Sequence, residues 1–574
     1  MPSNMGSVNV TYSPTNEAQR ILAFLCKQSP ALNLPDAVVQ NQDTVTFHST
    51  TDSIYFPIPF KETETLAALK AVEGLVAGQI ANLRFGTTSQ KKRSVEISLE
   101  AATYFACQAY MAKVGGLGKL DPGVKAKLKD TDLLAAQSNG YRRMSANLYK
   151  TKDEQFFHIH GSLEATTTLN MIGLEGHRPD LTDYQEIIKT IEGKVQNFTA
   201  AELETMNAER RQAGVTAYKY EDFIKTPHGQ TNVKESPWSV TPLKGNIPPT
   251  KFPCSPEGNH KILNGIKVLE LCRIIAGPTI TRILAEYGAD VLKITSPNLS
   301  DVPFFQVDGN MGKHAADLDL KTAEGRVEFE KLLADVDVFV DGYRPGALEK
   351  LGYGPEKLAE LAERRGKGIV YVNENCFGYK GEWAGRPGWQ QIADCVTGVA
   401  WAQGQFMGLN TPVVPPFPIS DYGTGCMGAI AALTGLYHRA TTGGSYHCTS
   451  SLMQYDLLLF AIGQYSAEIQ DQLRREQLPE FFALRHHDSV DRISATTLQM
   501  LRKRFPDLFI AGSERSSPYT EKWFSEKYGE EIEVVKPVAK IEGVDNGFVR
   551  ASRPNGSDRP VWEDFEVDEK DYSI

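Results

Sequence analysis

Short apolar runs alternate with helical patterns from residue 263 onward. The runs have the length of buried strands and occupy residues 266–271, 291–294, 336–340 and 369–372. Between them, apolar residues recur at helical spacing in 279–287, 322–334 and 356–365. This alternation predicts a parallel sheet with helices on its faces and a ligand site at the carboxyl ends of the strands.

The turn after the first predicted strand separates this sheet from a dinucleotide-binding fold. It reads Ala276-Gly277-Pro278 and lacks the GxGxxG fingerprint. We therefore predict an α/β fold with a parallel-sheet, Rossmann-like large domain, accompanied by a smaller α+β domain. A nicotinamide cofactor is not expected.

Before residue 236 the predicted helices and strands do not alternate regularly. Helical patterns are mixed there with short strands such as 94–99 and 156–160. Residues 236–262 contain six prolines, a composition typical of a linker. We therefore predict five regions: an N-terminal segment (1–59), a first unit with the small domain (60–235), a linker (236–262), a large α/β domain (263–470) and a C-terminal region (471–574).

Two stretches of the chain look like copies of each other. Residues 71–99 and 429–452 each read as a helix of small residues, an arginine, a Thr-Thr turn and a strand ending in Ser-Leu. One interpretation is coincidence between two helix–turn–strand units. The other is a tandem repeat whose first copy has lost its α/β half.

Charge and cysteine content narrow the class of protein. The 574 residues hold 61 Lys plus Arg and 71 Asp plus Glu, a formal net charge of −10, so neither nucleic acid nor a membrane is an expected partner. The eight cysteines form no CxxC pair, so no metal site is expected and the thiols are predicted to be reduced. No apolar run approaches the ~20 residues of a membrane span, and a cytoplasmic location is expected.

Four motifs between 263 and about 455 resemble the family III CoA-transferases. They are LNGIKVLELCRIIAGPTITRILAEYGADVLKI, DLDLKTAEGR, ADVDVFVDGYRPGALEKLGYG and PVVPPFPISDYGTG with its following helix. The α-methylacyl-CoA racemases are close relatives of that family. The resemblance implies interlocked large and small domains, with the active site at their seam. It leaves open whether this chain also forms a homodimer.

The resemblance implies a covalent mechanism on one aspartate. The matching residue is Asp421, which would form anhydride and thioester intermediates while CoA moves from one carboxylic acid to another. Gly423 or Gly425 could then supply oxyanion N–H donors. The alternative is that Asp421 only caps a helix starting near Thr424. By the register of the repeat, Glu64 falls near the lost nucleophile of the first copy, or it begins a surface helix.

The same resemblance gives candidate CoA contacts but no tightly bound cofactor; the CoA thioester is the substrate. Ile275 and Ala276 match the segment near the thioester. The other matching positions, near the nucleotide or its phosphates, are Leu318, Lys321, Tyr343, Arg344 and Lys350. Each charged residue among them could instead be an ordinary solvated side chain. The loop 138–141 falls where the transferases carry a glycine-rich loop.

Two other functions remain open from the sequence. A racemase or another acyl-CoA isomerase or lyase needs groups that exchange an α-proton, but the racemase acid is replaced by Gln390, and no histidine occurs between His314 and His438. Asp394 could substitute for that acid. His158 and His160 would share one face of a strand and are expected to be structural or solvent-facing. The other open hypothesis is that the chain is a non-catalytic protein that binds CoA or a partner.

Overall fold

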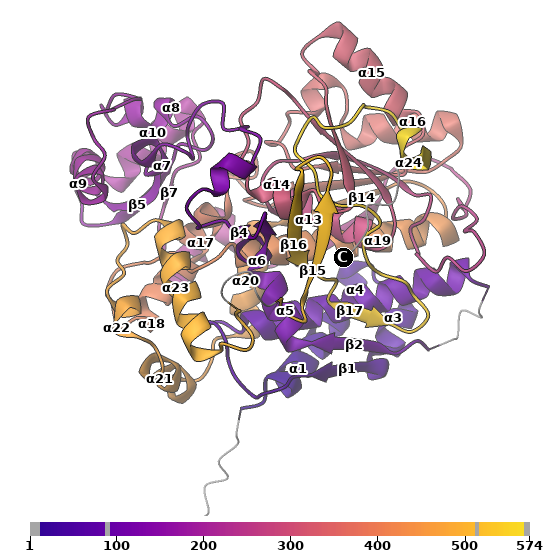
Figure 1. The fold of residues 1–574 in the computed structure, drawn as a ribbon, viewed down its shortest axis with the longest axis horizontal. Coiled ribbons are helices and arrows are strands. Elements are labelled where there is room, and N and C mark those ends of the chain that lie inside the picture. Colours follow the sequence, from indigo (N-terminus) through magenta and orange to yellow (C-terminus); the bar gives the residue numbers. More distant parts are fainter. Residues whose placement is uncertain (1–11, 87–91, 511–515, 568–574) are drawn as a thin grey trace, which may run out of the picture.

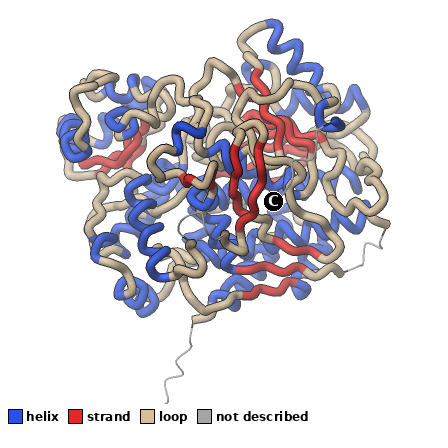
Figure 2. Tube along the Cα trace, in the orientation of Figure 1, coloured by secondary structure: helices blue, strands red, loops and turns tan. Residues whose placement is uncertain are grey.

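A seven-stranded sheet forms the centre of the larger part of the molecule. The computed structural model describes residues 12–86, 92–510 and 516–567. The strand order is β11-β10-β9-β12-β13-β14-β8. Figure 2 draws the strands of the molecule in red. These strands are β8 (Trp238–Pro242), β9 (Lys267–Leu271), β10 (Asp290–Thr295), β11 (Lys313–Asp317), β12 (Val338–Asp341), β13 (Val370–Asn375) and β14 (Tyr446–Ser451). All pair in parallel except β8, so the predicted parallel sheet is confirmed.

Helices cover both faces of this sheet because its apolar side chains alternate between them. Val268 and Val340 face the core that contains α13 (Ala276–Glu286) and α19 (Ile419–Thr441). Leu269 and Phe339, one position along, face the core with α15 (Ala323–Leu333) and α16 (Pro355–Arg365). The predicted helices at 279–287, 322–334 and 356–365 correspond to α13, α15 and α16 and are confirmed.

The N-terminal half contributes a second, smaller sheet beside the first. Its order is β1-β2-β17, in which β1 (Val45–His48) and β2 (Val95–Ser98) are parallel and β17 (Ala539–Ile541) is antiparallel to β2. The helix α4 (Glu62–Arg84) joins β1 to β2 and packs along α19 (Figure 1). The first copy's Thr-Thr turn, at 87–88, lies outside the described residues.

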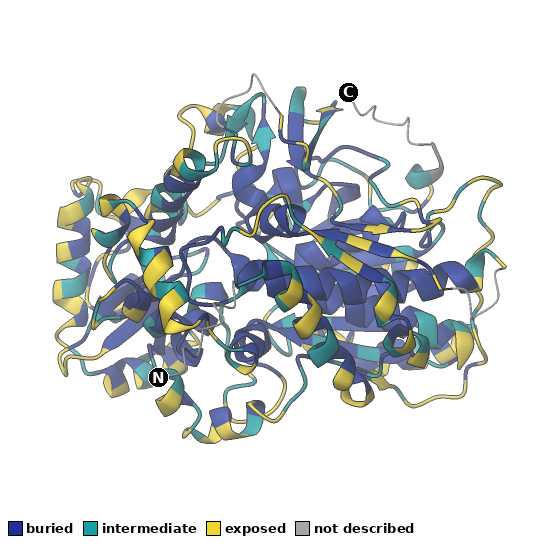
Figure 3. Ribbon diagram, turned by 90° about the horizontal axis from the view of Figure 1, so that it is seen from below, coloured by how far each residue is buried: buried dark blue, intermediate teal, exposed yellow. Residues whose placement is uncertain are grey.

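The length and composition of α4 would allow it to cross a bilayer. In this fold 94% of its most apolar window is buried. Figure 3 shows that the helices in the middle of the molecule are coloured dark blue for buried residues. The core helix of a folded domain meets the same criteria of length and composition, so the finding is weak evidence for a membrane span.

A separate lobe lies within residues 60–235, where the small α+β domain is predicted. Strands β5 (Ala146–Lys150), β6 (Phe156–His160) and β7 (Val215–Thr216) form an antiparallel sheet, with α8 (Thr166–Met171), α9 (Tyr184–Val195) and α10 (Ala200–Arg210) around it (Figure 1, left). The loop 138–141 leads into the short helix α7 (Gly140–Arg143), whose N-cap is Asn139. A glycine-rich loop like that of the transferases is therefore not formed here.

The predicted linker (236–262) and the predicted C-terminal region (471–574) both contribute strands to sheets formed by other parts of the chain. The proline-rich segment 236–262 contains β8, which closes the edge of the large sheet against β14. The region after 471 is distributed over the N-terminal half, since β16 (Glu530–Val535) pairs with β3 (Lys113–Val114) and β17 pairs with β2. The helices α22 (Pro479–Phe482) and α23 (Val490–Arg504) extend toward the small lobe.

Candidate active site

The candidate site lies where β9, β12 and β13 end. Cys272 follows β9, and Gly342 follows β12. The turn after β9 lies close against the turn after β12: a Cβ on Gly277 would lie 2.6 Å from the Cys272 sulfur and 3.8 Å from the Gly342 Cα. Glycine is therefore needed where the two turns meet. The carboxyl ends of the central strands form one compact rim, as the strand pattern predicts.

Asp421 lies at this rim inside α19. The helix begins at Ile419 after Pro418, so Asp421 is its third residue and does not cap a helix at Thr424; that alternative is wrong. Asp421 is buried, with only 9% of its surface exposed to solvent. A carboxylate in the first turn of a long helix is favoured by the free N–H groups and the positive end of the helix dipole.

The surroundings of Asp421 favour its protonated form in the ligand-free chain. Burial raises its pKa well above the usual value, and the charges of Glu374 and Asp394 raise it further. The backbone amide of Ala276 acts in the opposite direction. Burial also raises the pKa of Glu374 to about 8. The nucleophile candidate therefore shares a poorly solvated region with two other acidic groups.

The two glycines after Asp421 have a packing role. Both lie within α19, beyond the first turn, so their N–H groups are committed to helical hydrogen bonds. A Cβ on Gly423 would collide with the Tyr455 ring, and one on Gly425 would lie 2.5 Å from Thr279 Cβ. The expectation that these residues provide an oxyanion hole is wrong, because the helix starts earlier than the sequence pattern indicated.

Gln390 and Asp394 lie together on α17 (Gln390–Thr397). The Gln390 amide donates to Asp394 Oδ2, and Ser420 Oγ donates to Asp394 Oδ1 at 2.8 Å. Burial raises the pKa of Asp394 to about 7. Ser420 directly precedes Asp421, so Asp394 holds the start of α19. The sequence did not single out Ser420 or Glu374.

The two histidines of β6 are buried in a stack of rings. His158 lies next to His160, and His160 stacks on Trp389 with ring centroids 5.6 Å apart and 12° between the planes. Burial lowers the pKa of His158 to about 3 and that of His160 well below its usual value. They are neutral near pH 7 and fit the expected structural role, here in the interior.

The candidate CoA-binding residues share the same rim of the sheet. Ile275 is the N-cap of α13, and Ala276 begins that helix. Tyr343 and Arg344 follow β12, with Lys350 in the next turn, η3 (Glu349–Leu351). Leu318 and Lys321 follow β11, at the outer edge of the sheet. Lys321, Arg344 and Lys350 are exposed.

Arg273 is a basic residue that the sequence analysis missed. It lies one residue beyond Cys272 in the turn after β9, and its guanidinium lies 5.5 Å from the centroid of the Tyr343 ring. Desolvation lowers the pKa of Arg344, and the charge of Arg273 lowers it further. Two guanidinium groups that repel each other beside an aromatic ring suit a phosphorylated ligand. The sequence feature that could have identified Arg273 is its position in the turn after the first predicted strand.

Backbone strain occurs immediately before both helices of the site. Ile274 precedes the N-cap of α13 with φ of 69°, and Phe417 precedes the N-cap of α19 with φ of 63°. Positive φ is unfavourable for a β-branched or bulky residue, and such positions cluster at functional sites. The amide of Phe417 is held by Ser494 Oγ at 3.0 Å.

Comparison with known proteins finds similarity to CoA-transferases. The model of the family "CoA-transferase family III" matches residues 263–486. An acetyl-coenzyme A transferase, nodX, of Hypoxylon pulicicidum is 32% identical over 92% of this chain and 90% of its own length. A formyl-CoA:oxalate CoA-transferase of Escherichia coli is 31% identical over 38% of this chain and 52% of its own. A solved CAIB/BAIF family protein from Brucella suis is 28% identical, with a TM-score of 0.30 over 34% of this chain and 54% of its own.

Proposed function

This chain belongs to CoA-transferase family III, and from that premise we propose that it transfers CoA from an acyl-CoA to a carboxylic acid through covalent intermediates on Asp421. The observation that carries the proposal is the position of Asp421. It is a buried carboxylate in the first turn of a long helix, beside the Ala276 amide and at the carboxyl ends of the parallel strands.

The first half of the reaction would convert Asp421 into a thioester. One Asp421 oxygen attacks the thioester carbonyl carbon, the C–S bond breaks, and CoA leaves as the thiolate. The product is a mixed anhydride between Asp421 and the acyl group. The thiolate then attacks the Asp421 Cγ, which releases the first carboxylate and leaves aspartyl-CoA. No net proton is gained or lost.

The second half reverses these steps with a different acid. The acceptor carboxylate attacks Cγ of aspartyl-CoA, displaces the thiolate and forms a new anhydride. The thiolate attacks the acceptor's carbonyl carbon, so that a new acyl-CoA leaves and Asp421 is regenerated. Anhydrides hydrolyse readily, and the burial of Asp421 serves to exclude water from them.

We propose that Arg273, Tyr343 and Arg344 hold the CoA phosphates or adenine at the rim. The two guanidinium groups offer fixed, permanent charge, and the ring offers a stacking surface. Leu318, Lys321 and Lys350 are proposed as outer contacts. We also propose that residues 60–235 are a degenerate first copy that covers the site, and that the protein works in the cytoplasm, with or without further dimerisation.

The geometry gives the isomerase alternative little support. The acid of the racemases is replaced by Gln390, which cannot ionise, and burial keeps His158 and His160 neutral. Asp394, which could substitute for that acid, is occupied by hydrogen bonds from Gln390 and Ser420. Two-base proton exchange needs two groups that titrate near neutrality. Glu374, whose pKa is raised to about 8, is the other such group beside Asp421, and it is a carboxyl where the racemases use a histidine.

Chemical trapping tests the proposal. The protein is incubated with an acyl-CoA and hydroxylamine, digested, and analysed by mass spectrometry. A hydroxamate on the peptide that contains Asp421, absent without acyl-CoA and absent in Asp421→Asn, is expected. Turnover of the acyl-CoA with no modified peptide would overturn the covalent role. Deuterium uptake at the acyl α-carbon that survives Asp421→Asn would favour an isomerase.

A further inference from the structure

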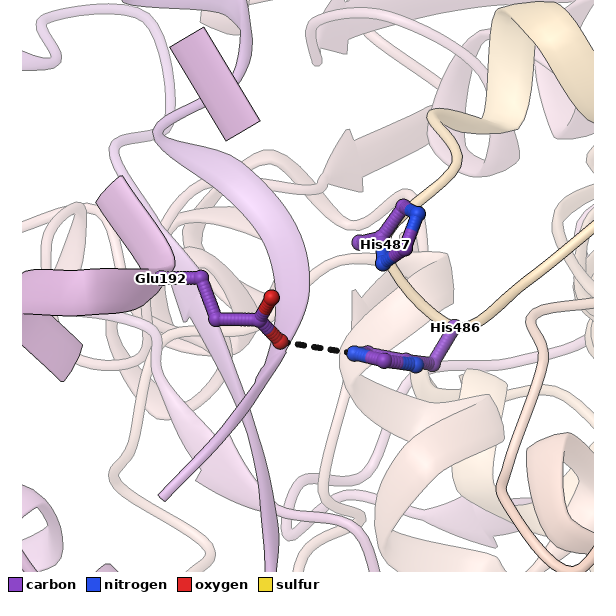
Figure 4. A group of neighbouring side chains, drawn as sticks. All are labelled: Glu192, His486 and His487. Carbon is purple, nitrogen blue, oxygen red and sulfur yellow. Dashed lines mark hydrogen bonds and ion pairs between the residues drawn. The ribbon is translucent and has the colours of Figure 1, made fainter. Parts of the chain in front are cut away.

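Three metal-ligating side chains meet between the small lobe and the C-terminal region. Glu192 lies on α9, whereas His486 and His487 lie between α22 and α23 (Figure 4). One ligand atom from each lies within 4.8 Å of the others. His486 Nε2 is 2.7 Å from Glu192 Oε1, across 294 residues of chain. The group is the one candidate of its kind among residues 12–86, 92–510 and 516–567.

Neighbouring groups hold these side chains in place. The Lys150 amide donates to Glu192 Oε1 at 3.0 Å. The Phe156 ring packs edge-on against His486, with centroids 5.0 Å apart. The Asn147 side chain donates to the His487 carbonyl at 2.6 Å and so fixes the backbone between the histidines. Metal sites carry such outer contacts because they orient the ligands.

The third side chain of the group, His487, takes no part in the ion pair between Glu192 and His486. Nδ1 of His487 is buried and has no hydrogen-bond partner. A buried nitrogen without a partner is costly, and native structures rarely keep one without a reason. An imidazole nitrogen without a hydrogen-bond partner is available as a metal ligand.

We propose that Glu192, His486 and His487 bind one divalent transition-metal ion of the zinc class. Two imidazoles and one carboxylate match the donor preference of zinc, whereas magnesium and calcium prefer oxygen ligands throughout. All three residues are partly exposed, which leaves a path for the ion and room for a water as fourth ligand.

The bound ion would tie α9 to the C-terminal region. The ion pair between Glu192 and His486 already connects the two elements, and Tyr184 at the start of α9 adds hydrogen bonds with Asp488 and Ser489. An ion that binds the folded chain and not the unfolded one stabilises the fold in proportion to its concentration. The site is separate from the rim that holds Asp421, so we assign it a structural role.

Zinc titration of the full-length, chelator-treated protein tests the proposal. Wild type should bind one Zn²⁺ per chain in calorimetry, and Zn²⁺ but not Mg²⁺ should raise its unfolding temperature. Co²⁺ should give visible absorption bands of a low-coordinate site. Glu192→Gln and His487→Gln should each weaken binding by at least about tenfold. The matched control is His260→Gln, since His260 is exposed and faces Asp545 3.8 Å away.

The proposal is overturned if wild type shows no saturable binding, in which case the group is an ion pair only. It is also overturned if Glu192→Gln binds as tightly as wild type, or if His260→Gln weakens binding as much as the ligand variants. Should His487→Gln fail to fold, wild type alone decides the question. Zn²⁺ must then protect His486 and His487 from acylation by diethyl pyrocarbonate, and a lack of protection contradicts the site.

Discussion

Two long helices that lie side by side in the core, α4 and α19, each carry a buried carboxylate near their start, but the surroundings of the two carboxylates differ. Both α4 and α19 have 23 residues, and each has a buried carboxylate as its third residue, Glu64 and Asp421. Each follows one strand and precedes another that is parallel to it: β1 and β2 around α4, and β13 and β14 around α19. Position in the helix alone therefore does not distinguish the proposed nucleophile from Glu64.

The difference lies in what surrounds each carboxylate. Glu64 accepts hydrogen bonds from the hydroxyls of Tyr12, at 2.7 Å, and Tyr465, at 3.0 Å. Among the described residues no side chain donates to Asp421, and the Ala276 amide is its polar neighbour. The sheet beside Glu64 has three strands, and that beside Asp421 has seven.

Separating the two halves should have the largest effect. A fragment of residues 263–574 lacks α4, β8 and the partners of β16 and β17, so it should aggregate and show no activity. Solubility and activity of the fragment, expressed alone and with residues 1–262, measure this. A soluble, monomeric, active fragment would contradict the dependence of one half on the other.

Removing either carboxylate should separate their roles. Asp421→Asn keeps the shape of the side chain but cannot form an anhydride, so kcat/KM should fall by at least ~10³-fold while stability changes by under ~1 kcal/mol. Glu64→Gln is the matched variant, and it should keep activity within about threefold because it touches no reacting group. Equal losses in the two variants would remove the distinction between the helices.

Raising the pH should weaken the fold through Glu62. Burial raises its pKa from 4.5 to about 8, and Tyr455 donates to it at 2.7 Å. The folded state therefore retains a proton that the unfolded state loses between these values, so the stability present at low pH is lost as the pH rises. Glu62→Gln cannot titrate, and its free energy of unfolding relative to wild type should rise by about 1.4 kcal/mol per pH unit.

Denaturant unfolding of both proteins from pH 4.5 to 8 measures this difference. The control is Glu360→Gln on the exposed face of α16, whose difference from wild type should not rise with pH. A flat difference for Glu62→Gln would mean that Glu62 is ionised in the folded protein.

Loss of Arg273 should weaken CoA binding more than it slows chemistry. Arg273→Gln should raise the KM for the acyl-CoA about tenfold and change kcat by less, since one charged contact to phosphate is worth about 1.4 kcal/mol. Lys357→Gln, a basic residue paired with Glu360 on α16, is the control and should leave KM unchanged. Unchanged KM in Arg273→Gln would exclude it from the phosphate site.

The smallest expected effect is a shift in pH dependence. Attack requires ionised Asp421, whose raised pKa means that activity is lost as the pH falls. Glu374→Gln removes the neighbouring charge that raises this pKa, so the acidic limb of kcat/KM should move to lower pH. An unmoved limb, or a move to higher pH, would contradict the pairing of Glu374 with Asp421.

Prediction from the sequence was most accurate for the strands of the large sheet, where a single hydrophobic pattern identifies each strand. The strands of the large sheet are buried on both faces and read as apolar runs, so β9, β10, β12 and β13 were predicted nearly in place. β8 was missed because its segment is rich in proline, and Pro242 is tolerated there since β8 is an edge strand. The structure starts α19 at Ile419, before the start near Thr424 that the sequence suggested, and the glycines at 423 and 425 fit against Tyr455 and Thr279.

Contacts across long stretches of chain could not be predicted from spacing. Glu192 and His486 are 294 residues apart, and neither belongs to a ligand motif. Likewise, Ser420 and Glu374 became recognisable as neighbours of Asp421 and Asp394 only once the strand ends were brought together.

Transfer of heavy oxygen into the protein tests the central claim most directly. The enzyme turns over an acceptor carboxylate that carries ¹⁸O in both oxygens, together with unlabelled acyl-CoA. The protein is then digested, and the masses of the peptides that contain Asp421 and Glu64 are measured by mass spectrometry. Because the acceptor attacks Cγ of the aspartyl thioester, label should accumulate in Asp421 and not in Glu64. Full turnover with no label in Asp421, or label in Glu64, would contradict the account.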